Sequence, residues 1–100
     1  MEIKSNKAVR IFAATVPESE SSLNRWLTIV SKTQFADFNA LHATFPSADV
    51  VKDVQGRSLT VFNIHGNKYR LIAAIHYNHN ILYIRHILTH AEYDKGKWKA

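Results

Sequence analysis

Hydrophobic residues recur at helical spacing in the first half of the chain. Between residues 17 and 32 they fall three or four positions apart, at Leu23, Trp26, Leu27 and Val30. This spacing places them along one face of an amphipathic helix. Pro17 suits the first turn because its missing N–H leaves no hydrogen bond unmade there, and Glu18 and Glu20 complement the positive end of the helix dipole. The sequence therefore predicts a helix over residues 17–32.

The rest of the first half predicts shorter elements. Residues 1–4 are expected to form a short edge strand, and residues 6–14 a helix. Apolar residues at Phe38, Leu41 and Phe45 indicate a third helix, which Pro46 and Ser47 end. We expect Trp26 and the phenylalanines to lie in the core, where aromatic side chains contribute most of the buried surface.

From Val50 onward the hydrophobic period changes to that of a strand. Residues 53–56 indicate a turn, and three strands are expected at 59–65, 68–77 and 81–89, which are rich in β-branched and aromatic residues. Helices followed by an antiparallel meander predict an α+β fold, with the N-terminal helices packed on one face of an antiparallel sheet. A chain of 100 residues suits one domain, spanning 1–100.

The register of the first hairpin predicts which side chains lie together. Gly66 and Asn67 both tolerate positive φ and form a two-residue loop, which pairs His65 with Lys68 and Asn63 with Arg70. Directly opposed side chains share a face of the sheet, so these four polar residues are expected to project together. The opposite face is apolar and should meet the helices; it comprises Phe62, Ile64, Tyr69, Leu71 and Ala73.

The loop between the second and third predicted strands places His90 beside this polar group. Residues 78–80 are expected to form a three-residue loop that sets Tyr77 opposite Ile81, and therefore Lys68 opposite His90. A slip of one residue would turn His90 to the other face, because the side-chain period of a strand is two. In the predicted register His90 joins Lys68 and Arg70 at one end of the sheet.

The net charge of the chain indicates which class of binding partner to expect. Thirteen Lys and Arg against eight Asp and Glu give a net charge of +5, which favours polyanions, nucleic acid above all. The absence of cysteine excludes disulfides and thiolate metal sites and fits a reducing cytosol. We find no signal-peptide core and no apolar run long enough to span a bilayer, so we expect a cytoplasmic protein without membrane contact. His86 and His90 lie four residues apart without paired carboxylates, so no metal site and no cofactor is expected.

The predicted cluster suits metal-free RNA cleavage. When a 2′-hydroxyl attacks the neighbouring phosphate, one proton must be removed, another supplied and a more negative phosphorane stabilised. Arginine can bind two phosphate oxygens at once, lysine neutralises charge, and histidine titrates near neutral pH. Tyr93 could stack on a base or assist proton transfer. The alternatives are ordinary ones: Arg70 in a structural ion pair, Lys68 solvated, His90 capping a strand, Tyr93 packed over the sheet edge, Asp94 orienting an arginine.

Two ordered motifs resemble the HigB family of bacterial toxins, a branch of the RelE-like ribonucleases. The first is Val-Phe-Asn-Ile-His-Gly-Asn-Lys-Tyr-Arg-Leu at residues 61–71. The second is Tyr-Ile-Arg at 83–85, leading into Thr-His-Ala-Glu-Tyr-Asp at 89–94. The resemblance implies a small RelE-like domain and a toxin that cleaves mRNA, often on translating ribosomes. It also implies inhibition by a cognate HigA-type antitoxin with a helix-turn-helix, which represses the operon.

The resemblance also implies roles for single residues. Arg70 matches the family's arginine that holds the scissile phosphate, and His90 matches the histidine of the C-terminal motif, expected to act as general acid. Lys68 and Tyr93 fall where related toxins place catalytic helpers. The remaining candidates are expected to contact RNA, namely Asn63, His65, Asn67 and Asp94. The general base stays open between His65, Lys68 and Tyr93.

Two other functions remain open from the sequence. A toxin of similar fold could inhibit a target such as DNA gyrase without cleaving RNA, and a basic module could bind RNA without catalysis. Loss of cleavage on replacing His90 would separate catalysis from simple binding. We expect the free toxin to be a monomer.

Overall fold

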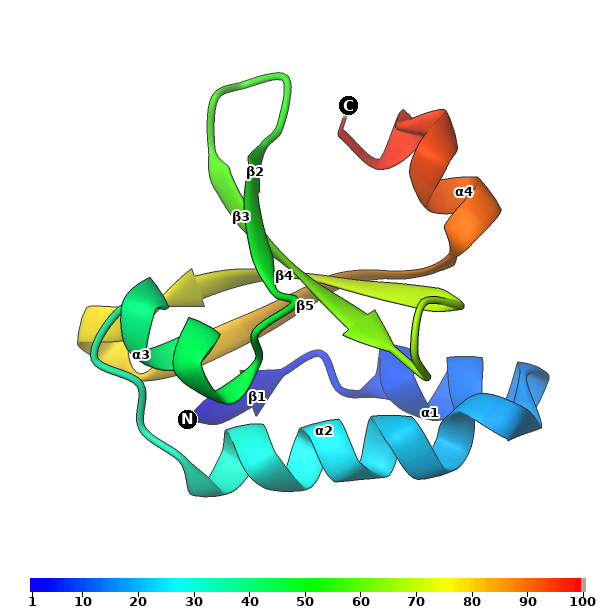
Figure 1. The fold of residues 1–100 in the computed structure, drawn as a ribbon, viewed down its shortest axis with the longest axis horizontal. Helices are drawn as coiled ribbons and strands as arrows, with labels where there is room; N and C mark the ends of the chain where they lie inside the picture. The colour runs from blue at the N-terminus through cyan, green and yellow to red at the C-terminus, as the bar shows by residue number, and fades with distance from the viewer. Residues whose placement is uncertain (100) are drawn as a thin grey trace.

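One five-stranded sheet organises the chain, with its strands in the order β1-β5-β4-β3-β2 (Figure 1). The computed structural model describes residues 1–99, so the last residue of the expected domain lies outside the described residues. The strands are β1 Glu2–Lys4, β2 Asp49–Lys52, β3 Ser58–Ile64, β4 Tyr69–His76 and β5 Ile81–Thr89. The helices are α1 Lys7–Thr15, α2 Glu20–Lys32, α3 Phe38–Thr44 and α4 His90–Lys95, with single 3₁₀ turns at Pro17–Ser19, Tyr77–His79 and Lys97–Lys99.

The expected α+β class is confirmed. Strands β2, β3, β4 and β5 form an antiparallel meander, whereas β1 pairs with β5 in parallel, so the sheet is mixed. Pro17 begins a 3₁₀ turn that leads into α2, rather than the first turn of α2 itself. No helix among residues 1–99 has the length and apolar character needed to cross a membrane.

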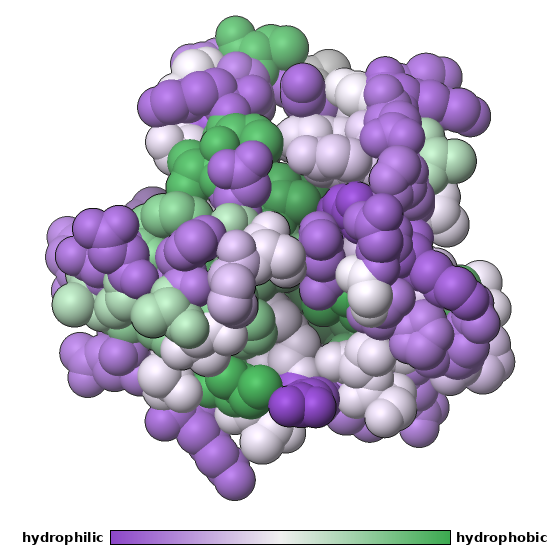
Figure 2. Space-filling model, in the orientation of Figure 1, coloured by the Kyte–Doolittle hydropathy of each residue, from purple (hydrophilic) through white to green (hydrophobic). Residues whose placement is uncertain are grey.

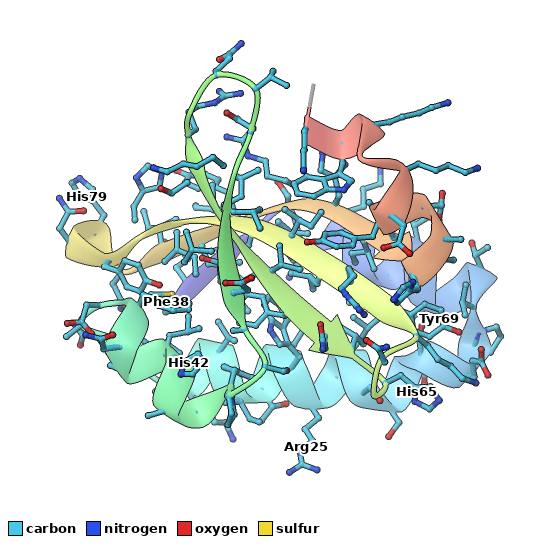
Figure 3. The ribbon with its side chains drawn as sticks, turned by 45° about the horizontal axis from the view of Figure 1, so that its top comes forward. Arg25, Phe38, His42, His65, Tyr69 and His79 are labelled. Atoms are coloured by element: carbon cyan, nitrogen blue, oxygen red, sulfur yellow. The ribbon has the colours of Figure 1, made fainter. Side chains whose placement is uncertain are left out.

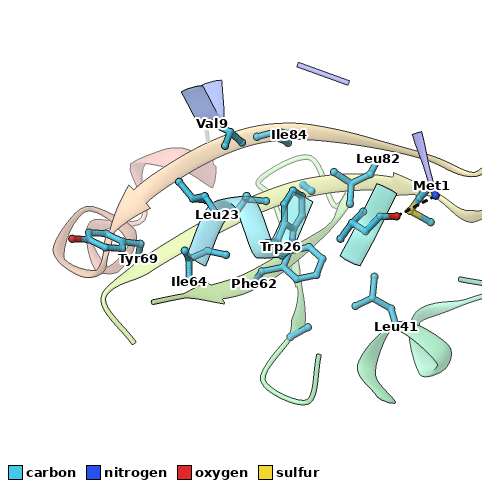
Figure 4. Packing of buried hydrophobic residues seen from close by; sticks show 14 of the residues in the cluster. Met1, Val9, Leu23, Trp26, Leu41, Phe62, Ile64, Tyr69, Leu82 and Ile84 are labelled. Carbon is cyan, nitrogen blue, oxygen red and sulfur yellow. Dashed lines mark hydrogen bonds between the residues drawn. The ribbon is translucent and has the colours of Figure 1, made fainter. Parts of the chain in front are cut away.

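The main core lies between the sheet and helices α1 and α2, as the alternation predicts (Figure 4). Leu23, Trp26 and Val30 on α2 are buried there. The Trp26 ring meets the Phe62 ring edge to face, with the centroids 5.2 Å apart. The N-terminal ammonium of Met1 donates to the Val30 carbonyl over 3.1 Å and so ties β1 to α2.

The face of the sheet that carries Asn63 and Arg70, expected to be a basic, hydrogen-bonding surface, is polar only in part, and the expectation is wrong to that extent. A second apolar cluster covers part of it, formed by Leu59, Val61, Ile72, Ala74 and Trp98. Trp98 lies in the last 3₁₀ turn and packs over the sheet next to α4. The C-terminal segment, from α4 to the last 3₁₀ turn, therefore forms a partial second layer over this face (Figure 1).

The β4–β5 register contains two differences from the predicted one, and they cancel. Ile81 pairs with His76, not with Tyr77, because the loop takes one more residue and ends with Asn80 at φ 56°. A β-bulge at Arg85 then inserts one extra residue into β5, since Ala73 faces Ile84 while Ile72 faces His86. Beyond the bulge the register matches the prediction, and the His90 N–H donates to the Lys68 carbonyl over 3.0 Å.

Helix α4 begins at His90, where only a strand end is expected. Thr89 is its N-cap in a reciprocal capping box: the Glu92 N–H donates to the Thr89 hydroxyl oxygen over 3.2 Å, and the Thr89 N–H donates to the Glu92 carboxylate over 3.0 Å. Gly96 ends the helix with φ 71°. A Thr-x-x-Glu sequence followed by such a glycine is a recognisable helix signal.

Thr89→Ala should weaken α4. Removing this N-cap should lower the free energy of unfolding by about 1 kcal/mol, because one N–H of the first turn loses its acceptor. Urea denaturation measures the change, and Thr28→Ala is the matched control, since Thr28 is exposed within α2 and bonds only to its own helix. Equal effects of the two substitutions would contradict the capping role.

Candidate active site

Arg70 is the fixed cation of the site. It lies on the central strand β4 with a residue exposure of only 8%. Its guanidinium donates to the Asn67 carbonyl over 3.0 Å, to the Tyr69 carbonyl over 3.3 Å and to the Asn67 side-chain oxygen. Within residues 1–99 no carboxylate comes within ion-pair distance of it. A positioned, largely buried guanidinium without a counter-ion is a strong site for an anion.

Tyr93 and Trp98 form an aromatic wall beside this cation. The Arg70 Cζ atom lies 5.5 Å from the centroid of the Tyr93 ring. Tyr93 stacks on Trp98 at 5.1 Å with the planes 13° apart, and the Trp98 Nε1–H donates to the Tyr93 carbonyl over 2.9 Å. Burial raises the pKa of Tyr93, an effect that Arg70 partly opposes. The hydroxyl is therefore protonated at neutral pH, so it can donate a hydrogen bond.

His90 enters the site from the first turn of α4. Its Nδ1 lies 2.9 Å from Oδ2 of Asp94, one turn along the helix. Because a carboxylate can only accept, Nδ1 carries a proton in this pair and Nε2 is left free for a substrate. His90 and Tyr93 are three residues apart on one helix and therefore project from neighbouring positions. Asp94 accordingly lies where it orients the imidazole.

The loop between β3 and β4 differs from its predicted form. Pairing ends at Ile64 and Tyr69, and the positive φ values belong to His65 (54°) and Gly66 (66°) rather than to Gly66 and Asn67. The register itself is the predicted one, with Asn63 opposite Arg70. Asn67 is thereby free to turn both of its oxygens toward the Arg70 guanidinium.

The four polar side chains expected on one face do not stay together. The left-handed backbone turns His65 toward α2, where Nδ1 lies 3.2 Å from the Ser22 hydroxyl and the ring stacks on Tyr69 at 6.2 Å (Figure 3). The Lys68 ammonium lies 3.6 Å from the Glu18 carboxylate, on the same helical side. Asn63 remains the cross-strand neighbour of Arg70 and shares its face. Asn63 and Tyr93 therefore flank Arg70, with His90 three residues before Tyr93 on α4. The His65 and Lys68 side chains make their contacts toward α2, and His65 and Asn63 line one hollow with Ser22 of α2.

Glu18, in the 3₁₀ turn that precedes α2, contacts the end of the β3–β4 loop and has no role in the sequence-based hypothesis. Its carboxylate accepts a hydrogen bond from the Tyr69 hydroxyl and pairs with Lys68. These contacts, the hydrogen bond first, lower the pKa of Glu18, and the same bond raises the pKa of Tyr69. Glu18 lies about fifty positions away along the chain, so no local signal indicates the contact.

Glu18→Gln should flatten the acid dependence of stability. The pKa of Glu18 is lower in the folded state than its ordinary 4.5, so this contribution is present above about pH 4.5 and is lost as the pH falls through the folded value. Urea denaturation between pH 7 and about pH 3 should show a smaller decline for Glu18→Gln than for the wild type. Glu20→Gln is the control, because Glu20 is exposed and makes no ion pair within residues 1–99. Parallel curves for all three proteins would contradict the assignment.

Metal ligation finds no support in the side-chain positions. Among residues 1–99 no three His, Cys, Asp or Glu side chains come together in a group able to hold a metal ion. Hydrophilic side chains gather over α4 and the adjoining end of the sheet (Figure 2). The site thus offers a positioned cation, an imidazole with one free nitrogen, and an aromatic hydroxyl.

Comparison with known proteins decides the family. Residues 19–96 match the family model described as HigB_toxin, RelE-like toxic component of a toxin-antitoxin system. The chain belongs to the HigB toxin family. The match covers α2, the whole β2–β5 meander and α4, so the HigB assignment rests on the part of the chain that holds the candidate site.

Individual HigB proteins also align with this chain, in agreement with the match to the family model. The mRNA interferase toxin HigB of Escherichia coli K12 is 32% identical over 94 residues, covering 94% of this chain and 88% of that protein. The mRNA interferase HigB of Shigella flexneri shows the same identity and coverage. A HigB of Escherichia coli O6:H1 is 28% identical over 95 residues, covering 95% of this chain and 90% of its own length. This HigB toxin thus has relatives that align along nearly its whole length, and its family implies an antitoxin partner.

Proposed function

We propose that this toxin, an endoribonuclease by its family, cleaves mRNA on translating ribosomes through attack of a 2′-hydroxyl on the adjacent phosphate. The 2′-hydroxyl gives its proton to solvent water and its oxygen forms a bond to phosphorus, while the bond to the 5′-oxygen breaks and that oxygen takes a proton from His90. The products carry a 2′,3′-cyclic phosphate and a 5′-hydroxyl. No step requires a metal ion. Three side chains of this chain serve the reaction directly: Arg70, His90 and Tyr93.

The observation that carries the proposal is the unneutralised guanidinium of Arg70. Its hydrogen bonds go to two carbonyls and one amide oxygen, which orient it without cancelling its charge. A phosphate that gains negative charge in the transition state would be stabilised there more than in the ground state. A purely structural arginine would be expected to pair with a carboxylate, and this one does not.

His90 is proposed as the general acid. With Nδ1 held by Asp94, Nε2 is the ring nitrogen that can deliver a proton to the departing 5′-oxygen. Tyr93 is proposed to stack on a base or donate to a phosphate oxygen, since its raised pKa keeps the hydroxyl protonated. The same protonation disfavours Tyr93 as the general base.

The remaining candidates for the general base are less favoured by their positions. His65 is engaged with Ser22, and Lys68 with Glu18, both on the side of α2. We propose that these two residues support RNA binding at the edge of the site, together with Asn63. For Asn67 we propose a positioning role, because both of its oxygens hold Arg70.

The setting of the reaction is part of the proposal. A net charge of +5 supports association with ribosome-bound mRNA, because counterion release favours binding to a polyanion. We propose that the toxin acts in the cytoplasm as a monomer. Its antitoxin is proposed to be of the HigA type, with a helix-turn-helix.

The test is expression of the chain in a bacterial host with and without its antitoxin, followed by mapping of new RNA 5′ ends. The expected result is growth arrest with discrete cuts inside translated messages, bearing 5′-hydroxyl ends. Cleavage by the purified toxin in the presence of excess EDTA should proceed unchanged. Arrest without RNA cuts would overturn the proposal and favour inhibition of a target such as DNA gyrase. A folded protein that causes no arrest would favour plain RNA binding.

A further inference from the structure

Part of β5 forms an open edge of the sheet. The short strand β1 pairs with β5 only from Ile81 to Tyr83. Beyond that point, within residues 1–99, no strand pairs with the side of β5 that faces away from β4. The bulge at Arg85 lies just beyond this boundary, and a bulge of this kind bends its strand. An open edge of this kind can accept another strand.

The direction of the free backbone groups follows from one hydrogen bond. The His90 N–H donates to the Lys68 carbonyl one position beyond the last ladder pair, Tyr69–Thr89, so this position has the hydrogen-bonded orientation. Hydrogen-bonded pairs alternate along an antiparallel ladder, so the Leu71–Ile87 pair is not hydrogen-bonded. The N–H and C=O of Ile87 therefore point to the open edge. The Thr89 N–H points there too, but the Glu92 carboxylate already accepts it.

Two hollows flank this edge, one on each face of the sheet. On the α1 side, a hollow of about 380 Å³ is lined by Ile11, Phe12 and Ile87 among others. On the α4 side, a hollow of about 400 Å³ is lined by Lys95, Lys97 and Trp98, and His86 and Leu88 line both hollows. Ile11 is 58% exposed, which is unusual for a large apolar side chain facing a hollow. Alternate side chains of an added strand would enter the two hollows in turn.

The charged side chains beside the open edge indicate what kind of segment can bind there. Arg85 lines the first hollow, and Lys95 and Lys97 line the second. The single carboxylate present, Glu92, is engaged by Thr89 at the start of α4. The edge therefore presents apolar walls beside uncompensated cations, which suits a segment carrying both apolar and acidic side chains.

We propose that an extended acidic and apolar segment of the antitoxin adds to the open edge of β5 as a strand. Main-chain hydrogen bonds to Ile87 supply the pairing, and side chains in the two hollows supply the specificity. The inference rests on the family's antitoxin partner and not on the catalytic mechanism. The strand contacts α4, which carries His90 and Tyr93, and leaves Arg70 on β4 uncovered.

Two variants and one amide test the proposal in the full chain. Ile11→Asp should weaken binding of the cognate antitoxin about tenfold or more, because it places an unpaired charge in an apolar contact beside an acidic segment. Val54→Asp is the matched control: Val54 is also apolar, is 72% exposed and lies in the β2–β3 turn, outside the lining of both hollows. In the isotope-labelled wild-type chain, hydrogen exchange at the Ile87 amide should slow by at least about tenfold when the antitoxin binds.

The outcomes separate the possible occupants. Tight antitoxin binding with unchanged Ile87 exchange, or equal losses in Ile11→Asp and Val54→Asp, overturns the proposal. Protection of Ile87 in the free chain as its concentration rises overturns it in favour of a second copy, and protection by an RNA oligonucleotide alone overturns it in favour of RNA. Ile11→Asp should still arrest growth as the wild type does, but resist neutralisation by the antitoxin. If the wild type itself arrests nothing, the proposed catalysis fails while the binding measurement remains decisive.

Discussion

Arg70→Ala is expected to lower the rate constant for RNA cleavage by about 10²–10³-fold, the usual cost of losing one positioned donor to a transition-state oxyanion. The guanidinium is held by Asn67 and Tyr69 and has no carboxylate partner within residues 1–99, so its charge is directed at the substrate. Single-turnover cleavage of a short RNA by the purified toxin measures the effect. The loss should fall mainly on the chemical step.

Two controls make the Arg70 result interpretable. Arg70→Lys keeps the charge but loses the planar fork, so it should recover only part of the rate. Arg10→Ala should cleave at the wild-type rate, because Arg10 is an exposed arginine on α1, beside a hollow between α1 and α2 that no residue of the candidate site lines. Since Arg70 is largely buried, thermal unfolding must show that each variant folds. A folded Arg70→Ala protein with wild-type cleavage would falsify the phosphate-binding role.

His90→Ala is expected to lower cleavage by about 10²–10⁴-fold, the range for loss of a general acid. His90 is partly exposed at the start of α4, so its removal should leave the fold intact. The effect on RNA affinity should be small, because Arg70 and the surrounding cations remain. Pre-steady-state kinetics and a separate binding titration with a non-cleavable RNA distinguish the two quantities.

A modified substrate identifies the role of His90. If the 5′-bridging oxygen is replaced by sulfur, the departing thiolate needs no proton, so a general acid becomes unnecessary. His90→Ala should then cleave the sulfur substrate at nearly the wild-type rate. Asp94→Asn, which removes the charge that orients the imidazole, should lower cleavage of the oxygen substrate by less than His90→Ala does. An equal defect of His90→Ala on both substrates would assign His90 to another step.

The strand half of the fold could be predicted because its signals are local. The predicted apolar face, from Phe62 to Ala73, lies in the main core, and Asn63 pairs with Arg70 as expected. The β4–β5 register is predicted correctly near Arg70, but only because two unpredicted shifts in the pairing cancel. The longer loop and the bulge at Arg85 each shift the pairing by one residue, in opposite senses. Neither has a strong sequence signal, because both depend on how the whole strand twists.

Helix α4 could have been predicted. Thr89, Glu92 and Gly96 carry the signals of a capped helix, but the preceding strand pattern and the short length conceal them. Its consequence is substantial, since a helix at this point brings Tyr93 to 5.5 Å from the Arg70 guanidinium carbon. A continued strand would have carried Tyr93 away from the sheet end.

By itself, the sequence determined the family, the α+β class, the alternation that buries one face of the sheet, and Arg70 and His90 as the leading candidates. These features follow from residue type and short-range spacing, which do not depend on the tertiary structure. The tertiary structure alone decided that His65 and Lys68 turn toward Ser22 and Glu18, and that Arg70 keeps its charge unpaired. It also left the edge of β5 open beside α4. Such outcomes depend on partners distant in sequence and on backbone geometry in a left-handed turn, which no local pattern specifies.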